Sequence, residues 1–203
     1  TMLAATLLAL VWALEHRNER AFVGAILLAA ITVTAYHSMK VYVPLILLAT
    51  AAVYWRQILK LRLEAMAYAA IIFTVIVGPI FWLSVRDPGG GARLAQTSVF
   101  NDKAFSPWLL VEQYFAYFSP RFWFVSGDGD PMHLPAGEGL VPLALAPVLL
   151  TGIVALCFMA QRGNDVSRRS ARFLLAAIVL FPVAGMLTVP NPHVLRAVHV
   201  LPI

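Results

Sequence analysis

Long apolar runs without a charged residue divide this sequence, and they limit the folds that the chain can adopt. They cover residues 1–14, 21–36, 43–55, 65–85, 140–160 and 173–190. A helix needs about 20 apolar residues to cross the hydrocarbon core of a bilayer, and a helix satisfies its own backbone hydrogen bonds there. The sequence therefore predicts an all-α integral membrane protein with about six transmembrane helices, the first of them truncated.

The composition supports a membrane protein and argues against a nucleic-acid-binding one. The chain is 61% hydrophobic and 12% charged, whereas soluble domains have about 45–50% apolar and about 25% charged residues. The net charge is +5, but the basic residues form short clusters between apolar runs. Such clusters orient helices in a membrane. Because the run 1–14 is too short to span, we expect the chain to be the C-terminal part of a larger protein.

The distribution of basic residues predicts the orientation of the helices. Two, three and four Lys or Arg residues lie in the junctions 15–20, 56–62 and 161–172, respectively. Short basic junctions face the cytoplasm. Residues 1–203 are therefore expected to form a single transmembrane domain of the inner (plasma) membrane. Junction 35–42, segment 86–139 and the C-terminal tail would then lie on the extracytoplasmic side.

The long extracytoplasmic loop 86–139 contains an aromatic-rich stretch, SPWLLVEQYFAYFSPRFWF. Ser106 is a suitable N-cap, and Pro107 suits the first helical position. Aromatic residues follow at near-helical spacing. The stretch predicts a helix over residues 106–123. Two locations stay open for it: the membrane interface, where aromatic residues gather, or the surface of the protein itself.

The stretch GDGDPMHLPAGEG follows, and its Gly, Pro and Asp residues are typical of turns. Asp128 and Asp130 resemble the carboxylates two apart in calcium-binding loops, but the other ligand positions are missing. We therefore expect a turn held by carboxylate-to-backbone hydrogen bonds, with no metal or other cofactor, and a divalent cation as the less favoured interpretation. His133 either faces the same cleft or is a solvated loop histidine.

Three stretches of the chain resemble one family of membrane enzymes. They are AYHSMKVYVPL, YFAYFSPRFWFVSGDGDPMHLPAGEG and PNPHVLRAVHVLP. The second contains an F-S-P, an F-x-x-G-D, a His and a P-x-G-x-G, and the third contains P-H-x-x-R. In this order they resemble segments of glycosyltransferase family 39. This family comprises GT-C fold enzymes such as the protein O-mannosyltransferases and the lipid A aminoarabinose transferases.

The resemblance implies an activity. Enzymes of this family take a sugar from a polyprenyl-phosphate carrier and transfer it to a protein, lipid or glycan acceptor on the extracytoplasmic face. Their catalytic aspartate lies in the first outer loop, and no residue here matches that motif. We therefore expect no catalytic residue in this chain and no activity from this part of the enzyme alone. The expected partners are the lipid-linked donor and membrane lipid.

The chemistry of the reaction suggests which residues bind the donor. Cleavage of the sugar–phosphate bond leaves an anionic phosphate, which cations stabilise strongly where water is scarce. The expected phosphate-binding residues are Lys40, His193 and Arg196, with Tyr36 and His37 as further hydrogen-bond donors. Two alternatives remain. Lys40 and Arg196 can snorkel to lipid headgroups, and His193 can make a hydrogen bond at a helix end. His199 has no assigned role.

Two other classes of protein stay open. A transporter or flippase would carry ionisable residues near the centres of its spans, and the central apolar stretches contain none. A non-catalytic membrane subunit would not need basic residues in several extracytoplasmic segments. The enzyme is the preferred interpretation.

Overall fold

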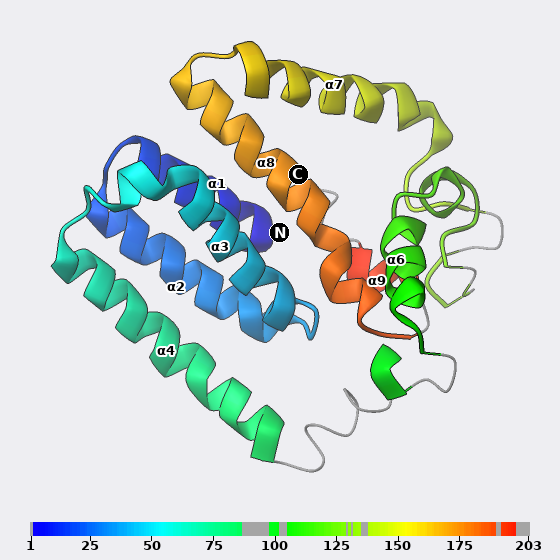
Figure 1. Cartoon of the computed structure of the whole chain (residues 1–203), viewed down its shortest axis with the longest axis horizontal. Helices are drawn as coiled ribbons and strands as arrows, with labels where there is room; N and C mark the ends of the chain where they lie inside the picture. Colours follow the sequence, from blue (N-terminus) through cyan, green and yellow to red (C-terminus); the bar gives the residue numbers. More distant parts are fainter. Residues whose placement is uncertain are drawn as a thin grey trace.

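The computed structural model describes residues 2–86, 98–101, 105–128, 130, 132–134, 138–189 and 192–197, with the backbone alone at Val85 and Arg196. Its longer helices are α1 (Met2–Glu15), α2 (Glu19–Ala35), α3 (Met39–Ile58), α4 (Leu63–Arg86), α7 (Ala146–Arg162) and α8 (Asp165–Met186). Its shorter ones are η1 (Val99–Asn101), α6 (Pro107–Ala116), η2 (Phe122–Ser126), η3 (Leu143–Leu145) and α9 (Val194–Ala197). Figure 1 shows this arrangement.

The predicted all-α fold is confirmed for the described residues, and each of the six apolar runs lies mainly in one helix. Four helical stretches are long and apolar enough to cross a membrane; they cover residues 39–58, 63–84, 143–162 and 165–186. α1 has 14 residues and α2 has 17, so both are shorter than the usual span of about 20.

The helices α1 and α2 pack closely because small side chains line their contact. The Thr6 and Thr32 hydroxyls lie 3.1 Å apart across this contact, so that one can donate to the other. A carbonyl one turn earlier in the same helix also lies within hydrogen-bond distance of each hydroxyl and can accept from the one whose hydrogen is not used across the contact. Four alanines of these two helices are also buried, with at most 1% exposure: Ala13, Ala25, Ala29 and Ala30. Polar groups in this contact are therefore satisfied without water.

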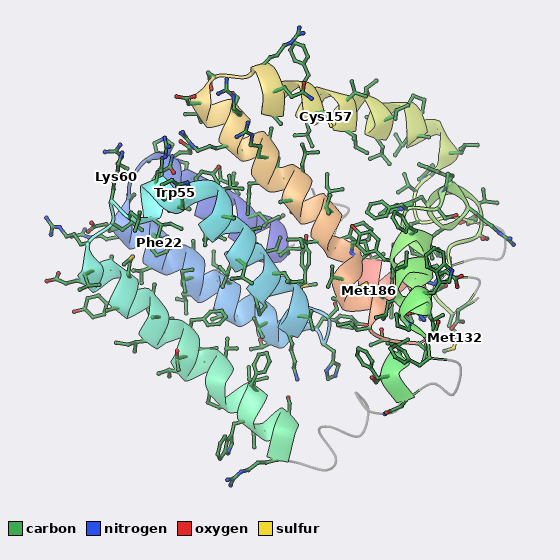
Figure 2. The ribbon with its side chains drawn as sticks, in the orientation of Figure 1. Phe22, Trp55, Lys60, Met132, Cys157 and Met186 are labelled. Atoms are coloured by element: carbon green, nitrogen blue, oxygen red, sulfur yellow. The ribbon has the colours of Figure 1, made fainter. Side chains whose placement is uncertain are left out.

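Two tyrosines of α3 bind α8. The Tyr42 hydroxyl donates to the carbonyl of Ala177 at 2.8 Å, and the Tyr54 hydroxyl lies 3.3 Å from that of Ser170. α7 packs mainly on α8, and most of its apolar side chains are exposed. Figure 1 shows α7 at the top of the molecule, and Figure 2 labels its exposed Cys157. An apolar surface of this extent is typical of helices that face lipid.

Three basic junctions lie at one end of the helices. The backbone N–H of Arg62, between α3 and α4, donates to the Glu19 carboxylate at 3.0 Å. Arg169 in the first turns of α8 binds Glu15 at the end of α1. Figure 2 shows Trp55 and Lys60 at this end. The basic junctions therefore share a side, as the charge pattern requires.

Two predicted helices have different bounds in the structure. The helix expected over 106–123 ends at Ala116, and a separate helical segment begins at Pro120. Proline restricts the residue before it to extended backbone, so Ser119 breaks the helix. The last apolar run was expected to stay helical to 190, but α8 ends at Met186. There the Leu187 carbonyl accepts from Val99 N–H at 3.0 Å.

α6 packs against the protein along one side. Its Tyr114 hydroxyl donates to the Val179 carbonyl of α8 at 2.7 Å, while Trp108 and Phe115 are exposed. Trp123, which follows the break, donates from its indole nitrogen to the Tyr117 carbonyl. The segment therefore uses some aromatic residues for internal packing and leaves others at the surface.

Candidate functional site

A tight turn places Asp128 at the start of the polar loop. Gly127 ends η2 with φ 54°, a backbone conformation that favours glycine. A Cβ at this position would lie 2.5 Å from Leu134 Cδ1. Glycine therefore allows both the turn and the close approach of the loop to its own start.

The predicted carboxylate-to-backbone hydrogen bonds are present in this loop. Asp128 Oδ1 accepts from the Asp130 backbone N–H at 3.2 Å, and Asp130 Oδ1 accepts from that of Met132 at 2.9 Å. The Asp130 carbonyl then accepts from the backbone N–H of His133 at 3.0 Å. These successive hydrogen bonds fold the loop back, so that the His133 side chain lies beside the Asp128 carboxylate.

The second carboxylate oxygen of Asp128 connects the loop to the C-terminal tail. Asp128 Oδ2 lies 2.8 Å from His133 Nδ1 and accepts from the Val194 backbone N–H at 2.9 Å. Val194 begins α9. One carboxylate therefore holds together two segments that lie more than sixty residues apart in the sequence.

His193 completes a cluster with Asp128 and His133. Its Nδ1 lies 3.8 Å from Asp128 Oδ2, and its ring centroid lies 4.6 Å from that of His133. The backbone N–H of His193 donates to the Tyr117 hydroxyl at 3.3 Å. Tyr117 in turn packs directly on Gly185 of α8. The long apolar framework thus fixes the position of His193.

The three side chains of this Asp128–His133–His193 cluster are largely enclosed, with 6%, 16% and 15% exposure respectively. Partial burial acts to raise the pKa of the Asp128 carboxyl, but hydrogen bonds from Val194, Asp130 and His133 outweigh it and lower that pKa. Asp128 is therefore ionised at neutral pH and accepts hydrogen bonds only. It follows that His133 donates from Nδ1.

A second group of predicted residues lies between α2, α3 and α4. A hollow of about 310 Å³ is lined by Thr34, Ala35, Tyr36, His37, Lys40 and Ile80. Lys40 Nζ donates to Ser84 Oγ at 3.1 Å, and Ser84 Oγ donates to the Ile80 carbonyl at 2.7 Å. Among the described residues, no carboxylate lies within ion-pair distance of Lys40. The hollow therefore combines one cation with two polar aromatic side chains.

The structure separates the predicted site residues into these two groups. Tyr36, His37 and Lys40 share the hollow, whereas His193 lies in the cluster with Asp128 and His133. Asp130 lies at the rim, with its carboxylate 46% exposed and 3.9 Å from His133 Nδ1. The Arg196 side chain and His199 lie outside the described residues, so the predicted role of Arg196 stays a prediction.

Two residues that position these groups were not identified in the sequence. Ser84 orients Lys40, and Tyr117 binds the backbone of His193. The charge pattern had already assigned the end of α4 and the start of α3 to one side, so a polar residue at the end of α4 was a signal for Ser84. Tyr117 gave no distinct signal, because it lies in a stretch rich in aromatic residues.

Comparison of the chain with models of protein families, with curated proteins and with solved structures gives no significant match. The fold and the two groups define a helical membrane protein with polar groups gathered at one end of apolar helices. The resemblance to family 39 rests on the three quoted stretches alone.

Proposed function

We propose that this chain is the membrane-embedded part of a glycosyltransferase that uses a polyprenyl-phosphate sugar, and that Tyr36, His37 and Lys40 bind the donor phosphate. The observation that carries the proposal is their common hollow beside Ser84. The sugar would pass to a protein, lipid or glycan acceptor on the extracytoplasmic face.

The bonding of Lys40 supports anion binding. An ammonium group has three donor hydrogens, and the hydrogen bond from Nζ to Ser84 uses one of them. Ser84 directs its own hydrogen to Ile80, so its oxygen is available to accept from Lys40. Nζ is thus held at the hollow with donors left for phosphate oxygens.

The position of the hollow suits a lipid-linked substrate. Its lining residues come from the end of α2, the turn 36–38, the start of α3 and the last turns of α4. α3 and α4 are both long enough to span a bilayer. A polyprenyl chain beside these helices would remain in hydrocarbon while its phosphate reaches the polar end.

The test is a binding measurement with two lipid probes. The full chain, in lipid nanodiscs, is titrated with a short-chain polyprenyl phosphate and with the corresponding uncharged polyprenol. We expect the phosphate to bind at least about 10-fold more tightly, because a charge-assisted hydrogen bond contributes about 1.5–3 kcal/mol. Lys40→Ala should remove this preference, and Lys40→Arg should retain most of it.

Lys60→Ala is the matched control, because Lys60 lies in the turn after α3, at the opposite end of that helix. Equal binding of phosphate and polyprenol by the unchanged chain would contradict the proposal. So would a phosphate preference that survives in a folded Lys40→Ala variant.

A further inference from the structure

Asp128, His133 and His193 have the composition of a transition-metal site. Each offers one ligand atom, and the three atoms lie within 4.8 Å of one another. Two imidazole nitrogens and one carboxylate oxygen form a common ligand set for zinc and related ions, and they leave a coordination position open. Hard cations such as Ca²⁺ and Mg²⁺ prefer sites made of oxygen ligands.

The separations between the ligand atoms are close to those of a tetrahedral zinc site. Zinc ligands lie about 2.0–2.2 Å from the metal in tetrahedral sites, which puts neighbouring ligand atoms about 3.4 Å apart. Asp128 Oδ2 lies 2.8 Å from His133 Nδ1 and 3.8 Å from His193 Nδ1. These two separations bracket the tetrahedral one, so each of these two pairs would need to change its spacing by only about 0.4–0.6 Å to match it.

Backbone donors hold the carboxylate in position. Asp128 accepts from the Asp130 and Val194 N–H groups, and neither bond involves a side chain that a metal would displace. Hydrogen bonds of this kind orient metal ligands and raise affinity. The hydrogen bond between His133 and Asp128 is the contact that a metal would replace: the proton leaves Nδ1, and the neutral imidazole that binds the metal carries its one proton on Nε2.

We propose that Asp128, His133 and His193 bind one divalent transition-metal ion of the zinc class. The ion would link the turn after η2 to the segment that begins α9. The proposal does not depend on the glycosyltransferase function, because it rests on a different group of residues. The alternative is that the cluster is only a hydrogen-bonded contact between loop and tail.

The experiment measures Zn²⁺ binding to the full chain, purified in detergent and stripped with a chelator. Isothermal titration with Zn²⁺ alone should show one ion per chain with a micromolar or lower dissociation constant, and Mg²⁺ should show no binding in that range. His133→Ala and His193→Ala should each weaken Zn²⁺ binding at least about 100-fold, since even residues that only support a ligand contribute 10–100-fold.

Two further variants keep the test decisive. In Asp128→Asn the amide oxygen still accepts from Val194, although the amide nitrogen cannot accept from the Asp130 N–H as Oδ1 does, and Zn²⁺ affinity should fall by a similar factor. In His16→Ala the histidine removed lies near the basic junctions, where its ring stacks on Trp12, and affinity should change by less than about 3-fold. Circular dichroism confirms the helix content of each variant. The absence of stoichiometric binding, or binding that His193→Ala and Asp128→Asn both retain, overturns the proposal.

Discussion

Arg169 donates two parallel hydrogen bonds to Glu15, from Nε to Oε1 at 3.0 Å and from Nη2 to Oε2 at 2.7 Å. These residues lie 154 positions apart, at the end of α1 and the beginning of α8. The Glu15 side chain is 8% exposed, and that of Arg169 is 27% exposed. This bidentate ion pair therefore joins the first and last long helices at the end that carries the basic junctions.

Loss of this ion pair should destabilise the protein. Glu15→Gln leaves the Arg169 guanidinium without its counter-ion, and we expect the free energy of unfolding to fall by about 1.5–3 kcal/mol. Denaturant titration in detergent measures the change. Asp165→Asn is the control, because the exposed Asp165 carboxylate pairs with Arg168 at 3.6 Å, and such pairs contribute about 0–1 kcal/mol. Equal losses for the two variants would contradict this account.

The orientation can be tested with single cysteines in a Cys157→Ser background. Cysteines at Asn18, Gln57 and Asn164 should be shielded from an impermeant thiol reagent in intact cells, because basic junctions stay cytoplasmic. Cysteines at Gly90 and Glu138 should react. The contacts of Glu19 with Arg62 and of Glu15 with Arg169 place the three shielded positions at one end. Labelling of the Gln57 position from outside would reverse the orientation.

The packing of Tyr117 on α8 predicts a position that tolerates no side chain. A Cβ on Gly185 would overlap the Tyr117 ring, so Gly185→Ala should lower the free energy of unfolding by about 1–3 kcal/mol. It should also displace Tyr117 from His193. Gly152→Ala on α7 is the control, because no atom lies within 4 Å of the Cβ there. Thermal unfolding of both variants in detergent compares them.

The family resemblance predicts a role for Arg196. Under the proposed function, Arg196→Ala should reduce sugar transfer by about 10²–10³-fold, the usual loss when a donor to a developing anion is removed. Arg196→Lys should recover only part of it, because lysine lacks the bidentate geometry. A residue that merely anchors to headgroups would tolerate lysine almost fully. Transfer rates with a polyprenyl-phosphate sugar distinguish these outcomes.

The sequence predicted the positions of the helices better than their ends. Charge-free runs located all six long helices, because lipid excludes unpaired charge. The runs could not show that α8 begins at Asp165, because its first turns contain charged residues. Such residues are tolerated at the membrane interface, and Arg169 among them is paired with Glu15. The break in the helix predicted over residues 106–123 was visible in Ser119-Pro120, but the helical spacing of the aromatic residues outweighed it.

The candidate sites were predictable only in part. Tyr36, His37 and Lys40 are close in sequence at the turn between α2 and α3, so their common hollow follows from local structure. The contact between Asp128 and His193 does not follow from local structure. It depends on the backbone turn at Gly127 and Asp130 and on the packing of Tyr117 against Gly185. The distribution of basic residues assigned these segments to the same side of the membrane, but only the packed structure gives their contacts.

The contact between α1 and α2 has a consequence for how the chain assembles. In lipid, apolar side chains gain nothing by leaving their surroundings for one another, so close approach and hydrogen bonds must select the partner helix. The alanines and the pair Thr6 and Thr32 supply both. Replacing those alanines by leucines would keep both helices apolar, yet the larger side chains would prevent α1 and α2 from approaching closely. The apolar character of these two helices and their choice of partner therefore depend on different residues.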